Sequence, residues 1–252
     1  MLDGDAALGS DAGLNGDIRA LVERTRFAGV RWVSQASSTN DEVAALARAG
    51  APEGAVVIAD RQSAGRGRRG RRWDAPAGSS LLVSVLLRPP AGAAHLALMA
   101  AGLAAVEACG TAAGVEASLK WPNDVIVPEG KLGGILSEAH AGAVVVGLGL
   151  NVDWGDEPLP DGAVSLAELA GRRVEVSELA VAYLVALDRR CDERPELVVD
   201  GWRAACTTIG RKVRVELPER TFEGVATGVT DDGRLVVAGE TVSAGDVVHL
   251  RP

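Results

Sequence analysis

Aromatic side chains are scarce in this chain: they make up 3% of its 252 residues, although 47% of the residues are hydrophobic. Ala, Val and Leu must therefore supply most of the core. A surface that binds nucleic acid is expected to be broadly basic and to carry aromatic side chains for base stacking. This chain has a net charge of -8 and few aromatics, so its composition argues against that class of protein.

Cysteine and histidine are also rare, with three of each. None has the spacing of a zinc site, and no histidine stands near a Ser or Cys nucleophile in the sequence. An odd number of scattered cysteines in apolar surroundings predicts reduced core residues. We therefore expect structural roles for all six residues, which are Cys109, Cys191, Cys206, His95, His140 and His249.

Long apolar segments are missing as well. No apolar run reaches the roughly 18 residues that span a bilayer. Residues 1–16 are acidic and glycine-rich, the opposite of the basic start and apolar middle of a signal peptide. These absences predict a cytoplasmic protein with no membrane partner.

Positive charge, by contrast, is concentrated in residues 61–74, where six arginines and three glycines fall within twelve residues. Glycine costs about 1 kcal/mol relative to alanine in a helix, so the segment is predicted to be a loop. Arginine presents a planar fork of donors to carboxylate or phosphate oxygens, and glycine lets the backbone approach a ligand closely. The loop is predicted to be a lid for an anionic ligand.

Two other interpretations of this loop are a solvated charged face and an Arg-Gly segment that binds RNA without sequence preference. The position of the loop favours the lid. It lies inside the chain, between strand-like residues 55–60 and 80–88, and it ends on the large apolar Trp73.

Periodicity and capping residues predict the remaining elements. Residues 1–13 are expected to be disordered, and Asn15 to cap a short helix. Thr39 and Glu42 match a capping box for a helix that ends at Gly50. Further helices are expected over residues 93–109, after Ser165 with Glu168 as its capping partner, and over 177–192 and 196–206. Strands are expected at 31–33, 117–121, 125–127, 132–140 and 143–151. This mixed order of hairpins and helices predicts an α+β domain.

The pattern changes near residue 208. Five short alternating runs follow, at 213–217, 221–229, 235–237, 240–242 and 247–250. Such a series predicts a small β-barrel. We therefore divide the chain into a tail of residues 1–13, a main domain of 14–207 and a C-terminal barrel of 208–252.

Three further clusters lie downstream of the arginine loop, at residues 120–124, 131–138 and 147–151. Each is ambiguous alone. Pro122 could mark a strand break, Gly133 and Gly134 a bulge, and Gly147 and Gly149 a place of close packing. Alternate glycines also leave one strand face bare, which suits a flat ligand.

Taken together and in order, the clusters resemble the biotin protein ligases. The matching segments are SSTN at 37–40, QSAGRGRRGRRW at 62–73, KWPND at 120–124, KLGGIL at 131–136 and GLGLN at 147–151. The resemblance implies a class II synthetase-like α+β domain, with a mixed or antiparallel sheet flanked by helices, and an SH3-like C-terminal barrel. It also implies two-step chemistry, in which the biotin carboxylate attacks the α-phosphate of ATP and a carrier lysine then attacks the adenylate.

The resemblance assigns residues to three roles. It implies that Lys131, Arg66 and Arg68 are catalytic. The biotin-binding residues would be Ser38, Thr39, Asn40, Gln62, Arg66, Gly67, Arg68, Lys131, Gly134, Gly147 and Gly149. The residues for ATP or the adenylate would be Arg66, Arg68, Arg69, Trp73, Asn123, Lys131 and Asn151. ATP, biotin and Mg²⁺ are implied, with no protein side chain assigned to the metal.

The implied acceptor is the carrier domain of an acyl-CoA or pyruvate carboxylase, and the implied assembly is a monomer or weak homodimer. About 36 residues precede the SSTN motif, so we expect no DNA-binding domain and no repressor activity. The arginine loop is expected to be mobile until biotin or the adenylate binds. Two alternatives remain: a lipoate–protein ligase, and a nucleic-acid-binding protein that uses the arginine loop.

Overall fold

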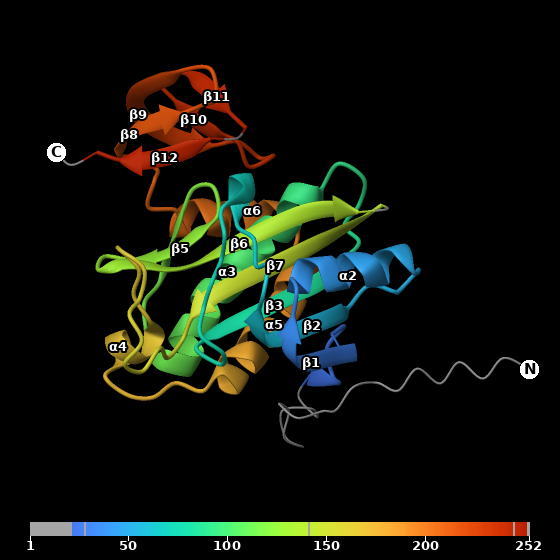
Figure 1. Cartoon of the computed structure of the whole chain (residues 1–252). Coiled ribbons are helices and arrows are strands. Elements are labelled where there is room, and N and C mark those ends of the chain that lie inside the picture. The colour runs from blue at the N-terminus through green and yellow to red at the C-terminus, as the bar shows by residue number, and fades with distance from the viewer. Residues whose placement is uncertain (1–21, 28, 141, 244, 251–252) are drawn as a thin grey trace, which may run out of the picture.

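The computed structural model describes residues 22–27, 29–140, 142–243 and 245–250. The predicted disordered tail lies outside these residues, as does the beginning of the short helix expected after Asn15. The described residues form two β-sheets of different size, and the larger one carries helices on both faces (Figure 1).

The larger sheet has seven strands in the order β1-β2-β3-β7-β6-β5-β4. β1 and β2 are parallel, and every other neighbouring pair is antiparallel, so the predicted mixed α+β sheet is confirmed. The strands are β1 (Gly29–Ala36), β2 (Ala55–Gln62), β3 (Ser80–Leu87), β4 (Ser118–Lys120), β5 (Asp124–Val127), β6 (Gly130–His140) and β7 (Ala143–Asn151).

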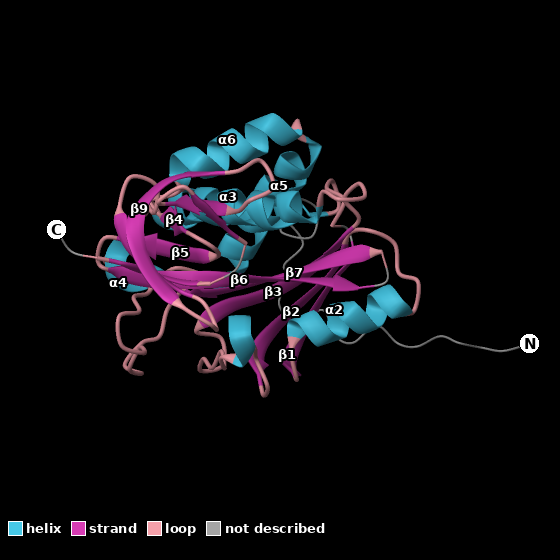
Figure 2. Ribbon diagram, turned by 90° about the horizontal axis from the view of Figure 1, so that it is seen from above, coloured by secondary structure: helices cyan, strands magenta, loops and turns pink. Residues whose placement is uncertain are grey.

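Helices cover the two faces of this sheet unequally. Figure 2 shows α3, α5 and α6 stacked over one face and α2 alone against the other. The main apolar core lies under the three helices, and a smaller cluster packs α2 onto β2, β3 and β7. The helices are α2 (Thr39–Arg48), α3 (Ala94–Ala113), α4 (Leu166–Ala170), α5 (Val176–Asp192) and α6 (Pro195–Ala205).

Helix α3 is longer than the helix expected over residues 93–109. By length and composition it could cross a membrane, and within the described residues it alone passes that test. Its most apolar 18-residue window is 67% buried inside the protein, against α5, α6 and the sheet. The small, apolar composition of α3 is therefore accounted for by close packing in the core.

The start of α2 differs from the predicted capping box. Ser38, not Thr39, is the N-cap residue, and no side chain caps the helix. Thr39 has another partner, because its hydroxyl and its backbone N–H both donate to Oε1 of Gln62 on β2. The capping box at Ser165 and Glu168 is confirmed at the start of α4.

The C-terminal strands form a second sheet, in the order β11-β10-β9-β8-β12. The long β9 pairs with β8 through its first half and with β10 through its second half. The described strands show no pairing between β11 and β12, so the sheet is open where a closed barrel was predicted. Its strands are β8 (Lys212–Glu216), β9 (Thr221–Val229), β10 (Leu235–Val237), β11 (Glu240–Val242) and β12 (Asp246–His249).

Trp121 makes two of the contacts that join the C-terminal region to the larger sheet. Trp121, which is buried, donates from Nε1 to the carbonyl oxygen of Gly233 at 2.9 Å. The hydroxyl of Thr208 accepts from the Trp121 backbone and lies 3.0 Å from Nε2 of His249. The residues of the KWPND segment therefore connect the two sheets.

The three cysteines are free, as expected. Cys109 and Cys206 are buried, whereas Cys191 is only partly buried. Burial raises the thiol pKa of all three, so they stay protonated near neutral pH.

Candidate active site

A cavity of about 270 Å³ opens on the larger sheet beneath the arginine loop. Every residue that the resemblance assigned to the site lines it, with the exception of Arg69. The lining residues from that set are Ser38, Thr39, Asn40, Gln62, Arg66, Gly67, Arg68, Trp73, Asn123, Lys131, Gly134, Gly147, Gly149 and Asn151. Segments that are far apart in the sequence therefore meet at one place.

One end of the cavity is a network of mostly neutral polar groups. Thr39 donates to Gln62, and Ser84 lies 2.7 Å from both the Thr39 hydroxyl and Oδ1 of Asn40. The Asn40 amide donates to Glu138 at 2.6 Å. Thr39, Asn40 and Ser84 are all buried. Since these side chains are hydrogen-bonded to one another, this end of the cavity is organised before any ligand binds.

The floor of the cavity is the bare face of β7. A Cβ added to Gly147 would lie 2.2 Å from Oδ1 of Asn40, and one added to Gly149 would lie 2.7 Å from the Trp73 ring. Only glycine fits at either position. In this structure the Trp73 indole rests on Gly149, and its buried Nε1 has no hydrogen-bond partner among the described residues. Trp73 therefore offers an unused donor.

Lys131 owes its orientation to a β-bulge. The register between β5 and β6 shifts between Val125 and Ile126, which leaves one extra residue on β6. Lys131 and Gly134 stand three apart and would face opposite sides of a regular strand. The bulge turns both toward the cavity, where a Cβ on Gly134 would lie 3.6 Å from the Lys131 Nζ.

The backbone of Lys131 is also tied down. Its N–H donates to Gly162, and its carbonyl accepts from Val164, so the segment after β7 runs beside it. The ammonium forms an ion pair of 2.6 Å with Asp124 Oδ1. An anionic ligand at this lysine must therefore compete with the Asp124 carboxylate.

The arginine loop closes as a short hairpin. Trp73 donates to Gly65 and Gly67 donates to Arg71 across it, with a single 3-10 turn, Arg68–Gly70, at its tip. The prediction of a loop without an α-helix is confirmed. The structure contains one conformation, so the predicted ordering on ligand binding stays a prediction.

Arg66 leans from the loop toward α2. Its guanidinium binds both oxygens of Asp41, at 2.7 and 2.8 Å, and lies 3.5 Å from Glu138. The hydrogen bonds to Asp41 raise the pKa of Arg66, and those same bonds lower the pKa of Asp41. In this conformation Arg66 is neutralised by the protein itself.

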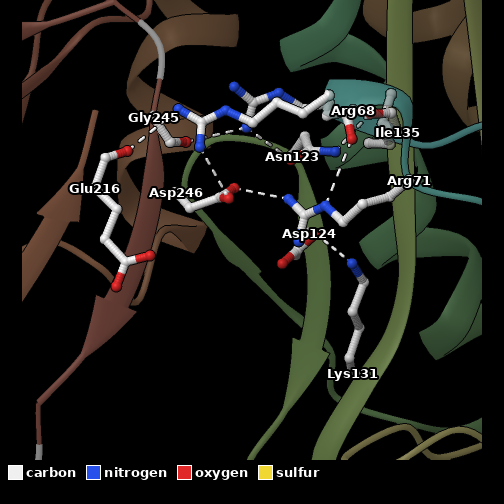
Figure 3. A network of polar contacts seen from close by, with 10 residues as sticks. Arg68, Arg71, Asn123, Asp124, Lys131, Ile135, Glu216, Gly245 and Asp246 are labelled. Carbon is white, nitrogen blue, oxygen red and sulfur yellow. Dashed lines mark hydrogen bonds and ion pairs between the residues drawn. The ribbon is translucent and has the colours of Figure 1, made fainter. Parts of the chain in front are cut away.

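Arg68 is different. Among the cationic side chains of the cavity, it alone has no carboxylate within ion-pair distance in the described residues. Its guanidinium donates weakly, at 3.4 Å, to Asn123 and to the carbonyl of Gly245. Burial lowers its pKa, although an arginine remains charged. Figure 3 shows Arg68 beside Asn123 and Lys131 beside Asp124.

The sequence analysis assigned no role to three side chains that the structure places in or behind the site: Ser84, Asp124 and Glu138. Asp124 stood inside the KWPND motif and Glu138 just after the KLGGIL motif, and that was their only signal. Ser84 interrupts the apolar run of residues 81–87 in β3 at a fully buried position, and a lone polar residue in such a run predicts a buried hydrogen bond. The segment that supplies Trp154, Asp161 and Ala163 to the lining carried no recognisable pattern.

The fold and this cavity together define a class: a domain whose cavity offers neutral polar groups at one end and cationic side chains at the other. Comparison with known families gives the particular family. Residues 32–153 match the model of the biotin/lipoate A/B protein ligase family, and residues 208–250 match that of the biotin protein ligase C-terminal domain.

Individual relatives agree. The chain is 41% identical to a biotin–[acetyl-CoA-carboxylase] ligase of Mycobacterium tuberculosis, over 93% of this chain and 96% of that protein. It is 34% identical to the enzyme of the same name from Paracoccus denitrificans, over 82% and 93%. The biotin protein ligase from Aquifex aeolicus, solved with biotin and ATP, superimposes with a TM-score of 0.76 at 26% identity, covering 90% of this chain and all of that one. The chain therefore belongs to the biotin/lipoate A/B protein ligase family, among the biotin protein ligases.

Proposed function

We propose that this enzyme activates biotin with ATP to biotinyl-5′-AMP and transfers the biotinyl group to a lysine of a biotin carboxyl carrier domain. One observation carries the proposal: a single cavity joins the neutral network around Asn40 to the cations Lys131 and Arg68. Biotin has a polar, uncharged ureido ring and a carboxylate at the end of its chain. The cavity offers complementary groups at its two ends.

In the first step, the biotin carboxylate attacks the α-phosphorus of ATP and pyrophosphate leaves. Two anions must meet, so the barrier is lowered mainly by alignment and by fixed positive charge. Lys131 binds the carboxylate and then the phosphate of the adenylate. Arg68, which has no carboxylate to release, faces the phosphates, and Arg66 joins once the ligand displaces Asp41.

In the second step, an uncharged carrier lysine attacks the acyl carbon of the mixed anhydride. The carbon–oxygen bond to phosphate breaks, AMP leaves, and an amide forms with loss of one proton. Lys131 and Arg68 stabilise the charge that develops on the departing AMP. The arginine loop excludes the water that would otherwise hydrolyse the adenylate.

The neutral end binds the ureido ring. Ser38, Thr39, Asn40 and Gln62 supply donors and acceptors there, and the bare face of Gly147 admits the flat ring. At the nucleotide end, Trp73 leaves the β7 floor and covers the adenine, where its Nε1 gains a partner, with Asn123 and Asn151 beside the phosphates. Arg69 joins this end only if it turns away from its present contacts.

Mg²⁺ would enter with ATP and would neutralise phosphate charge. The described residues contain no group of three or more His, Cys, Asp or Glu side chains that could hold a metal ion. We further propose a cytoplasmic monomer or weak homodimer that does not bind DNA, with residues 14–207 as the catalytic domain. Residues 208–252, which include the C-terminal sheet, would be an SH3-like domain.

Transfer is tested by incubating the protein with biotin, ATP, Mg²⁺ and a purified biotin carboxyl carrier domain. Mass spectrometry should show the mass increase of one biotinyl group on the carrier, and none when its acceptor lysine is replaced by arginine. A carrier that stays unmodified while biotinyl-AMP accumulates would contradict the transfer step and leave the activation step standing.

A further inference from the structure

The C-terminal sheet holds the arginine loop through one carboxylate. Nη1 of Arg69 donates to Oδ2 of Asp246 at 3.0 Å, and Nη2 of Arg71 donates to Oδ1 of the same residue at 2.7 Å. Asp246 begins β12, 175 residues away from Arg71 in the chain. Both of its oxygens are therefore engaged by the loop, which lies on the other sheet.

Backbone groups reinforce this contact at the same spot. Arg69 also donates to the carbonyl of Glu216 at 3.2 Å, and Arg68 lies 3.4 Å from the carbonyl of Gly245. Glu216 and Asp246 are register partners on β8 and β12. The loop is therefore docked on one end of a paired strand edge, which Figure 3 shows from close by.

The loop backbone requires such support. Arg69 has a φ of 56°, in the left-handed region that a non-glycine residue enters only at a cost. A strained conformation persists where its surroundings hold it in place. Asp246 binds the side chains of Arg69 and Arg71, which flank the turn on either side of Gly70. With both flanks held, Arg68 at the start of the turn points inward to Asn123.

We infer that Asp246 is a positioning residue for adenylate formation: by fixing Arg69 and Arg71 on the C-terminal sheet, it presents Arg68 to the phosphates of ATP. The inference rests on the proposed function. It gives the C-terminal sheet a defined part in the active site, although Asp246 does not line the cavity itself. It also gives Arg69 an anchoring role that the sequence did not predict.

A simpler interpretation is that these are ordinary surface ion pairs, which usually contribute little. The two interpretations differ in what they predict for Asp246→Asn, a change that removes the charge and keeps the shape. The matched control is Glu240→Gln. Glu240 is an exposed carboxylate on β11 of the same sheet, and its ion-pair partner is Arg220, which is not part of the loop.

The first readout is hydrogen exchange of residues 65–73 in the ligand-free protein. Asp246→Asn should speed exchange of the loop amides roughly fivefold or more, because opening of the loop is no longer opposed by its anchor. Glu240→Gln should leave it unchanged. Since this readout needs no substrate, it reports on the anchor even if the chain proves not to activate biotin.

The second readout is ATP–pyrophosphate exchange with biotin. Asp246→Asn should raise the KM for ATP roughly fivefold and change the KM for biotin less than twofold, because Arg68 serves the phosphates. A general loss of structure would instead change both constants and lower the Tm. Asp246→Glu, which keeps the charge, should recover most of the difference.

A double-mutant cycle with Arg71→Ala decides whether the two residues act through each other. If they do, adding Arg71→Ala to Asp246→Asn should raise the KM for ATP little further. Additive effects, or an Asp246→Asn variant that matches Glu240→Gln in both readouts, would overturn the inference. If Asp246→Asn fails to fold, the exposed Arg71→Ala alone must loosen the loop and raise the KM for ATP, and a normal result there overturns it equally.

Discussion

The two ends of the cavity are built in opposite ways. Around Ser84 and Asn40, buried neutral groups hold one another through short hydrogen bonds that belong to the core of the fold. Around the arginine loop and Lys131, the side chains are partly exposed, and most are neutralised by a carboxylate of the protein itself. The first end is organised by packing, and the second is held by ion pairs that an anionic substrate can replace.

This difference implies different costs for substitutions at the two ends. A substitution at the neutral end either removes buried hydrogen bonds or adds atoms that clash with the groups that form them. It should therefore lower both stability and biotin binding. A change at the charged end removes partly exposed cations, so it should lower activity with little loss of stability. Three predictions test this contrast, beginning with the largest expected effect, and a fourth concerns the contact between the two sheets.

Lys131→Ala should abolish most adenylate formation while the protein stays folded. Removing a charge that faces the reacting groups typically costs about 100-fold or more in rate. The side chain of Lys131 is 40% exposed, so the Tm should change little. Biotin-dependent pyrophosphate exchange measures the activity, and Lys212→Ala, an exposed lysine of the C-terminal sheet, is the control. Full activity in Lys131→Ala would remove this residue from the mechanism.

Gly147→Ala should damage stability and biotin binding together. The added methyl group would lie 2.2 Å from Oδ1 of Asn40, which is fixed by Ser84 and Glu138. Overpacking of this kind costs about 1–3 kcal/mol, and the KM for biotin should rise roughly tenfold or more as Asn40 moves. Urea unfolding and exchange kinetics measure the two effects.

The control for this glycine is Gly110→Ala in α3, where an added Cβ meets nothing within 4 Å. Alanine in a helix should stabilise the protein by up to about 1 kcal/mol there and leave the KM for biotin unchanged. A Gly147→Ala variant that behaved like Gly110→Ala would show that the floor of the cavity tolerates a side chain.

Ser84→Ala should have a smaller effect of the same kind. Its hydroxyl contacts both Thr39 and Asn40 in a fully buried position, and a buried polar group left without its partner costs about 1–3 kcal/mol. The KM for biotin should rise a few fold. Ser177→Ala, at a partly exposed position on α5, should be neutral in both assays. A stable Ser84→Ala variant with altered biotin binding would mean that the network is not part of the fold.

The smallest effect concerns His249, which lies outside the cavity at the contact between the two sheets. Burial, with added repulsion from Lys120 and Arg211, lowers its pKa to about 4. As the pH falls, His249 is therefore protonated near pH 6.5 in the unfolded chain but only near pH 4 in the folded protein. The contribution of His249 to stability is full above pH 6.5 and is lost as the pH falls toward 4.

The Tm measured between pH 7 and pH 4 should accordingly fall less steeply in His249→Gln than in the unchanged protein. Pyrophosphate exchange at pH 7.5 should be the same in both. Parallel Tm curves would show that the imidazole is not held neutral at this contact.

The sequence predicted the strands that carry the site and fourteen of the residues that line it, because each motif is local and has a recognisable pattern. It did not predict the role of Ser84 or Glu138, whose partner Asn40 is 44 and 98 residues away. Nor did it predict the bulge that turns Lys131 toward Gly134. The open edge of the C-terminal sheet and the start of α2 were also not predicted. Both depend on tertiary contacts, which the periodicity of a sequence does not reveal.

The arginine loop is another feature that the sequence predicted only in part, because its conformation depends on distant residues. Its composition predicted a lid for an anion, and the resemblance to a family assigned Arg69 to the nucleotide. By our inference, the inward direction of Arg68 depends on Asp246, which binds Arg69 and Arg71 from a strand that pattern alone would not connect with the loop.

ATP–pyrophosphate exchange in the presence of Mg²⁺, with biotin or lipoate added separately, tests the central claim most directly. The account predicts exchange that requires biotin and does not occur with lipoate, because the neutral network matches a ureido ring and offers nothing specific to a dithiolane. Exchange with lipoate alone would contradict it, as would the absence of exchange with either acid.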